Sequence, residues 1–117
     1  MNAILQKYQP QAVYSQGRSP NGNNIRIGGY ETGFLPYPAW SDGTIGQENG
    51  GGSPDGPDFL PIEADTTYAV KDAWFWKPGQ QYRPLSQLQM TYVNSVGRNG
   101  NLMLGAIPDN TGIIPAD

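Results

Sequence analysis

Three acidic residues stand where carboxylate chemistry could take place. Glu31 lies within G-G-Y-E-T-G-F at Gly28–Phe34, where glycines let the backbone approach a ligand closely and aromatic rings can wall a site. Glu63 and Asp65 close the short apolar run predicted as a strand over Phe59–Ala64, so both are expected at its carboxyl end. The alternatives are a glutamate on a solvated loop and a pair of strand-end acids bonded to backbone N–H groups or arginine.

The composition limits which side chains could carry out acid/base chemistry or bind a metal. The 117-residue sequence has no Cys and no His, which removes disulfides, thiol catalysis, Cys-based zinc sites and the commonest general base. Any acid/base step therefore falls to carboxylates or tyrosine. The Gly/Asp-rich stretch Asp42–Pro57 lacks the residue order of an EF-hand calcium loop. We accordingly expect no metal and no cofactor.

A run of aromatic residues is the second feature with a chemical reading. Trp74, Phe75 and Trp76 are consecutive in W-F-W-K-P-G, so they cannot all face one core, and at least one should meet solvent or a ligand. A tryptophan ring stacked on the apolar face of a sugar is a common way to bind such a ligand. The alternative is that both tryptophans are packing residues.

One helix is predicted clearly. The segment Leu85–Gly97 carries an S-x-x-Q capping box that begins at Ser86 and a glycine placed to end the helix. Its spacing predicts a buried stripe, with Thr91 on the outside; the stripe consists of Leu88, Tyr92 and Val96. A shorter helical segment is expected over Asn2–Tyr8.

Four strands are expected, and they set the fold class. Besides Phe59–Ala64, they are Gln11–Gln16, Ile25–Ile27 and Asn101–Ile107. The last has no charge and no polar alternation, which is typical of a strand buried on both faces. Together with the helices, this pattern predicts an α/β fold with a parallel sheet.

Composition excludes other classes of partner. The net charge is −3 with only 7 Lys and Arg and no basic run, so no nucleic-acid partner is expected. No segment is long and apolar enough to suggest a membrane partner. Glycine and proline are abundant, but 37% hydrophobic residues with 3 Trp and 7 Tyr indicate a loop-rich folded chain of at most one domain.

Several segments, taken in order, resemble a known family. V-G-R-N-G-N-L-M-L, with W-F-W-K-P-G upstream and P-D-N-T-G-I-I-P downstream, is similar to the final strand region of the barrel of α-L-fucosidases, glycoside hydrolase family 29. Q-P-Q-A-V, R-I-G-G-Y-E-T-G-F and L-P-I-E-A-D recur in the family's order. The resemblance implies that residues 1–117 are the C-terminal portion of a catalytic (β/α)8 TIM barrel, about its last four strands, because a whole barrel needs roughly 200 residues or more.

The resemblance also implies roles for the residues above. It implies hydrolysis of terminal α-L-fucosyl residues with retention, and Glu31 occupies the position assigned as general acid/base in relatives with G-x-E-x-G. In some subfamilies the glutamate at the position of Glu63 is proposed instead. Gly105 stands where relatives usually have Asn, so a supporting hydrogen bond is lost. Residues expected to bind the fucosylated glycan are Tyr30, Asp65, Trp74 and Trp76.

The family's nucleophile motif, W-x-D-G or F-D-G, does not occur. Asp42-Gly43 and Asp55-Gly56 lie in polar loop instead of closing an apolar strand. Since a retaining glycosidase needs two carboxyl groups about 5–5.5 Å apart, we expect this chain alone to be inactive and to belong to a longer enzyme, secreted or periplasmic by resemblance. The alternative is a carbohydrate-binding half-barrel without catalysis. Its exposed sheet edges would need the missing half of the barrel or a second copy as partner.

Overall fold

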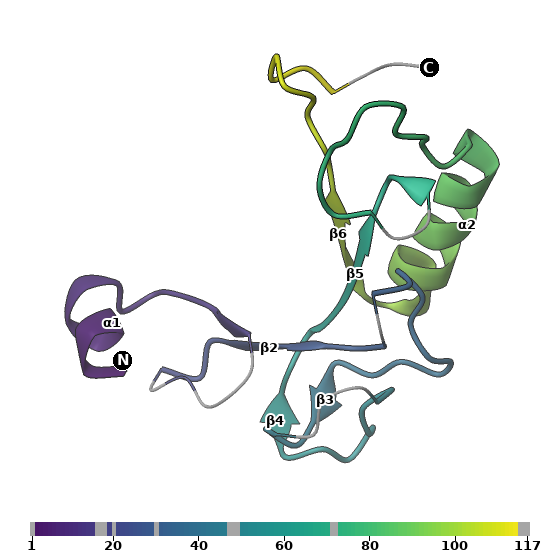
Figure 1. Ribbon diagram of the computed structural model, residues 1–117. Helices are drawn as coiled ribbons and strands as arrows, with labels where there is room; N and C mark the ends of the chain where they lie inside the picture. Colours follow the sequence, from purple (N-terminus) through teal and green to yellow (C-terminus); the bar gives the residue numbers. More distant parts are fainter. Residues whose placement is uncertain are drawn as a thin grey trace.

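The computed structural model describes residues 2–15, 19, 21–29, 31–46, 50–70 and 73–114 (Figure 1). Both predicted helices are confirmed, the second one ending in a short 3₁₀ turn. In chain order, the elements are α1 (Asn2–Tyr8), β1 (Tyr14–Ser15), β2 (Asn24–Ile27), β3 (Asp42–Gly43), β4 (Asp58–Phe59), β5 (Ile62–Thr67), α2 (Leu85–Ser95), η2 (Val96–Arg98) and β6 (Asn101–Gly105).

Strands β1, β2, β5 and β6, which overlap the four predicted strand regions, form one parallel sheet, as predicted. The strand order is β1-β2-β5-β6, which is also the chain order, while β3 and β4 form a separate antiparallel pair. Within the described residues the sheet stays open, with β1 and β6 at its edges. The molecule measures 45 × 36 × 16 Å, and its bent outline encloses no barrel (Figure 1). The fold is therefore α/β with an open parallel sheet.

The predicted strand over Phe59–Ala64 is displaced in the structure. Phe59 belongs to β4, and Pro61, which has no N–H for a ladder, separates it from β5. Strand β5 then continues to Thr67. Glu63 and Asp65 consequently lie inside the strand, and not beyond its end.

Helix α2 covers one face of the sheet over a small apolar core. That core consists of Leu35, Ile62 and Ala64, each at most 1% exposed, with Leu102 packed against it. Leu35 also receives a backbone hydrogen bond from the guanidinium of Arg98, which joins the segment after β2 to the end of the helix. The core thus lies between β5, β6 and the segment after β2, and none of its described members belongs to α2.

The buried face of α2 differs from the predicted stripe. The helix begins after Pro84, which makes no side-chain cap, so the predicted capping box at Ser86 is wrong. Thr91 and Ser95 are the buried residues, whereas Tyr92 is 57% exposed. The reason is the surface beneath the helix, where Gly33 lies against Thr66 and Thr91 and leaves room only for small side chains.

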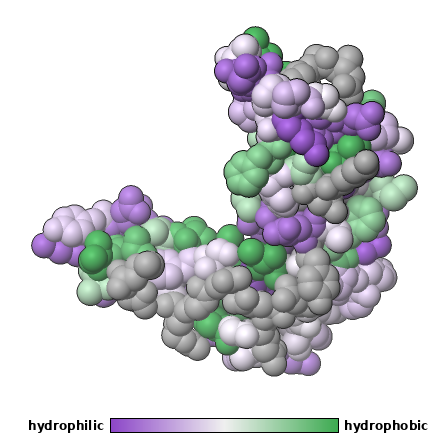
Figure 2. Space-filling view, in the orientation of Figure 1, coloured by the Kyte–Doolittle hydropathy of each residue, from purple (hydrophilic) through white to green (hydrophobic). Residues whose placement is uncertain are grey.

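Strand β6 is not buried on both faces, contrary to expectation. Leu102 packs on the core under α2, but Met103, on the opposite face, is 47% exposed. Among the described residues no layer covers that second face. Figure 2 shows apolar residues along the concave side of the bent outline. No helix in the described part of the chain is both long enough and apolar enough to cross a membrane.

Candidate active site

The loop that carries Glu31 follows β2 and is fixed to the neighbouring strand β5 at two points. At its start, the Gly28 N–H donates to the Glu63 carbonyl at 2.8 Å, and further on the Gly33 N–H donates to the Asp65 carbonyl at 3.0 Å. Between these two bonds, the Glu31 carbonyl accepts a hydrogen bond from Thr66 Oγ1 at 3.0 Å. The backbone of Glu31 is therefore held over β5, while its side chain is exposed.

Gly33 is what lets this loop return so close to the strand. Its φ is +75°, a left-handed conformation that favours glycine. A Cβ there would lie 2.7 Å from Thr91 Cγ2 and 2.8 Å from Thr66 Cγ2, both of which are buried. The absence of a side chain at Gly33 thus brings the loop, β5 and α2 together.

Glu63 and Asp65 project from one face of the sheet. Asn101, the cross-strand partner of Glu63 on β6, donates from Nδ2 to Glu63 Oε2 at 2.9 Å, so these two side chains share a face. Because side chains alternate along strands, Asp65 with Met103 and Thr67 with Gly105 lie on that same face. This is the face that no helix covers among the described residues.

Glu31 and Glu63 both act electrostatically on Asp65. The pKa of Asp65 is raised above its ordinary value, first by partial burial and then by the negative charges of Glu31 and Glu63. A backbone hydrogen bond from Thr66 opposes part of that shift. Three carboxylates therefore share one end of the sheet, although the described residues contain no acidic group arranged to hold a metal ion.

Trp74 lies over the end of the same face. Thr67, which is fully buried, donates from Oγ1 to the carbonyl of Ala73 at 2.8 Å and so holds the start of the aromatic segment on β5. A Cβ built on Gly105 would meet Trp74 Cζ3 at 3.3 Å, so the indole occupies the space beside β6 that a side chain at this position would take.

The other predicted binding residues are placed less closely. Trp76 is half-buried. Phe75 is 85% exposed and is the ring of the three that meets solvent. Tyr30 lies outside the described residues.

Comparisons with known proteins agree with this arrangement. No family model matches the chain. Alpha-L-fucosidase 1 of Arabidopsis thaliana is 30% identical over 96% of the chain. A candidate α-L-fucosidase structure from Bacteroides thetaiotaomicron is 32% identical over 97% of the chain with a TM-score of 0.81. A Ruminococcus gnavus GH29 fucosidase, solved with fucose, is 27% identical over 80% with a TM-score of 0.69.

The chain is similar to α-L-fucosidases over nearly its whole length. The resemblance to glycoside hydrolase family 29 is thereby confirmed by curated relatives and by solved structures. The chain spans only 23% of the length of the Arabidopsis fucosidase, 30% of the Bacteroides protein and 21% of the Ruminococcus fucosidase.

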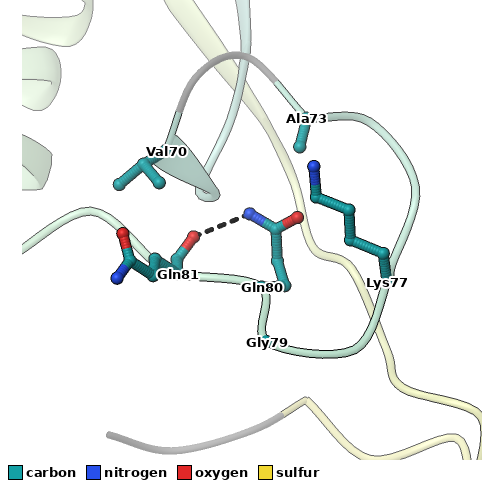
Figure 3. Close-up of a pocket in the computed structure, with 6 residues that line it drawn as sticks. All are labelled: Val70, Ala73, Lys77, Gly79, Gln80 and Gln81. Carbon is teal, nitrogen blue, oxygen red and sulfur yellow. Dashed lines mark hydrogen bonds between the residues drawn. The ribbon is translucent and has the colours of Figure 1, made fainter.

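The loop between β5 and α2 adds a cavity to this fucosidase-like fold. The loop is closed at its base by the stacked rings of Tyr68 and Tyr82, 4.4 Å apart, and by the hydrogen bond from the Arg83 N–H to the Tyr68 carbonyl. The cavity it encloses holds about 300 Å³ (Figure 3). Its lining consists of Val70, Ala73, Lys77, Gly79, Gln80 and Gln81. None of the three acidic residues, Glu31, Glu63 and Asp65, is among the residues that line this cavity.

Two residues of the site were not singled out from the sequence. The sequence predicts Asn101 only as the first residue of an apolar strand. It is the one polar side chain in that run, and this is the feature that could have drawn attention to it. Thr67 carried no signal, since a threonine in a strand needs no special role. Asn101 acts through a partner fixed by cross-strand register, and Thr67 through a carbonyl six residues further along the chain.

Proposed function

We propose that this chain forms the C-terminal portion of the catalytic barrel of a retaining exo-α-L-fucosidase, which hydrolyses terminal α-L-fucosyl residues of glycans. The observation that carries the proposal is the gathering of Glu31, Glu63 and Asp65 at one end of a parallel sheet. In barrels of this class, catalytic groups come from the carboxyl ends of several strands and the loops that follow them. The fucosidase names of the relatives give the substrate class.

Glu31 is the better candidate for general acid/base. It stands on a loop whose backbone is anchored, its side chain is exposed, and no described residue donates a hydrogen bond to its carboxylate. Glu63 is engaged by Asn101 within the strand. This hydrogen bond fixes the direction of the Glu63 carboxylate. Glu63 is therefore proposed to orient the sugar or the neighbouring acids.

The nucleophile is proposed to come from residues outside this sequence. Retention needs a second carboxylate on the opposite side of the anomeric carbon, and the family's nucleophile motif is absent from the 117 residues. Acid/base assistance is worth typically ~10²–10⁴-fold, whereas enzymes accelerate by ~10⁶-fold or more. The chain alone is consequently proposed to be inactive and to pair with the rest of the barrel.

The sugar is proposed to bind against the aromatic residues of the same end. Trp74 lies on the face that carries Asp65, and Tyr30 follows β2 in the glutamate loop. Asp65 is placed to accept hydrogen bonds from sugar hydroxyls. Trp76, on the segment after β5, is proposed to complete the aromatic wall.

The test compares Glu31→Gln with Glu63→Gln in the complete enzyme. Loss of the acid should lower kcat/KM by about 10²–10⁴-fold for fucosides with poor leaving groups and little for aryl fucosides that leave unassisted. Azide, which needs no general base, should restore turnover of the activated substrate by Glu31→Gln. Glu63→Gln should lower activity on both substrates alike and show no rescue. The reverse pattern would assign the acid/base role to Glu63.

A further inference from the structure

The position of Trp74 depends on a residue that has no side chain. Gly105 ends β6 on the face that bears Glu63 and Asp65, and a Cβ there would stand 3.3 Å from Trp74 Cζ3 and 3.6 Å from Cε3. Ordinary carbon contacts begin near 3.5 Å, so even one methyl group would push the ring away. The six-membered ring of the indole therefore rests on the backbone of β6.

The segment that presents Trp74 is fixed from the other side as well. Thr67 is the cross-strand partner of Gly105 and donates from Oγ1 to the carbonyl of Ala73, the residue before Trp74. Thr67 itself is fully buried, and the hydrogen bond is part-buried. The indole is thus held by an anchor on β5 and by the space left open at Gly105 on β6, and a side chain at that position would shift it towards solvent.

We infer that Gly105 is a positioning residue for sugar binding: its missing side chain seats the indole of Trp74 as a flat apolar wall at the end of the carboxylate face. This inference rests on the proposed function, because the sugar that stacks on the ring is the fucosyl group. A 6-deoxy sugar has an apolar edge at its methyl group, and an aromatic ring is the side chain suited to contact it. A side chain at Gly105 would remove this wall without touching the acids.

The test uses the 117-residue chain with Trp40→Phe and Trp76→Phe, which leaves Trp74 as the one tryptophan. Gly105→Ala and Gly105→Asn should shift its emission to longer wavelength, the second more than the first, because the ring moves into water. L-fucose binding is measured by calorimetry in the chain that keeps Trp40 and Trp76, and its apparent affinity should fall about three- to tenfold in Gly105→Asn. Gly97→Ala is the matched control, since its Cβ would meet only Val93 Cγ1 at an ordinary 3.8 Å.

A double-mutant cycle of Gly105→Ala with Trp74→Phe separates this role from a general loss of stability. If Gly105 acts through the indole, Gly105→Ala weakens fucose binding in the parent and has no further effect once the indole is gone. Equal fucose affinity in the parent and both Gly105 variants would overturn the inference and leave the proposed function standing. A chain with Trp40 and Trp76 intact that shows no heat of binding with L-fucose would also overturn the inference, whereas the proposed function is decided separately by Glu31→Gln and Glu63→Gln in the complete enzyme.

Discussion

Asn101 and Glu63 face each other across the parallel pair of β5 and β6, joined by a 2.9 Å hydrogen bond from Nδ2 to Oε2. This bond fixes the direction of a carboxylate that would otherwise point freely from the uncovered face. Substitutions of Asn101 can therefore test how a charge opposite Glu63 affects the stability of the sheet.

Replacing Asn101 by Asp puts a second carboxylate in the place of the donor. Like charges directly opposite on a sheet are destabilising, so Asn101→Asp should lose about 1 kcal/mol of unfolding free energy at pH 7. The loss should shrink in acid, where carboxyl groups become neutral. Urea unfolding at pH 7 and pH 4 measures both values. Asn101→Ala, which removes the donor without adding charge, should show a smaller loss that does not depend on pH in this way.

Asp65 should make folding depend on pH in the sense opposite to that of a salt-bridged acid. Its folded-state pKa is raised above the ordinary 3.8 by burial and by Glu31 and Glu63. The native state therefore binds the proton more tightly than the unfolded chain, and stability falls as pH rises from the unfolded pKa through the folded one. Asp65→Asn should raise Tm at pH 7 and leave it unchanged below pH 3.8. Asp55→Asn, on the exposed loop between β3 and β4, is the control and should leave Tm unchanged at both pH values. A lower Tm for Asp65→Asn at pH 7 would contradict the predicted sign.

Gly33→Ala should separate steric overlap from backbone strain. The left-handed φ costs an L-residue roughly 1–2 kcal/mol, and the overlap with Thr91 and Thr66 should add about 1–3 kcal/mol. Gly22 has the same φ of +75° with open space around a built Cβ, so Gly22→Ala should show the first cost alone. Chemical denaturation of both variants gives the difference. Thr91→Ser, which deletes Cγ2, should recover part of the loss in Gly33→Ala but none in Gly22→Ala.

Arg26 should be needed to hold the loop that contains β3 and β4. Its side chain is 3% exposed and donates to the carbonyls of Gly50 and Trp40, the latter at 2.6 Å. Hydrogen bonds from a charged group are worth about 1.5–3 kcal/mol each, and a lysine cannot span two acceptors as a guanidinium does. Arg26→Lys should therefore destabilise by about 2 kcal/mol or more and speed proteolysis of the loop. Arg98→Met, which loses one hydrogen bond to the Leu35 carbonyl and a contact with the Tyr37 ring at 6.0 Å, should cost less; equal losses would count against a two-acceptor clamp.

Local pattern predicted the two helices and the parallel sheet, but it placed Glu63 and Asp65 at the end of a strand that in fact continues to Thr67. It failed where a residue's neighbour comes from elsewhere in the chain. Thr91 is buried because Gly33 and Thr66 form the surface under α2. The spacing of apolar residues within the helix cannot predict that surface. β6 is exposed on one face because burial depends on a covering layer, which an apolar strand cannot reveal by itself.

The same limit applies to the site. Glu31, Glu63 and Asp65 were found from residue type and from their neighbours in sequence, and the fold gathers them at one end of the sheet. The contacts of Asn101 with Glu63, and of Trp74 with Gly105, depend on the register of β5 against β6. A glycine at the end of an apolar run indicates nothing about which ring will lie on it.

Helix α2 meets the sheet through hydroxyl-bearing residues and a glycine. Thr91 faces Thr66 and Gly33, and the buried Ser95 donates from Oγ back to the Thr91 carbonyl at 2.7 Å. Such a contact removes little apolar area from water, so it contributes little hydrophobic free energy. The helix should therefore open as a separate unit while β5 and β6 stay paired. In native-state hydrogen exchange, the amide protons of α2 should therefore exchange before those of β5 and β6. Strand β5, which carries Glu63 and Asp65, should keep its protection longer than the helix does.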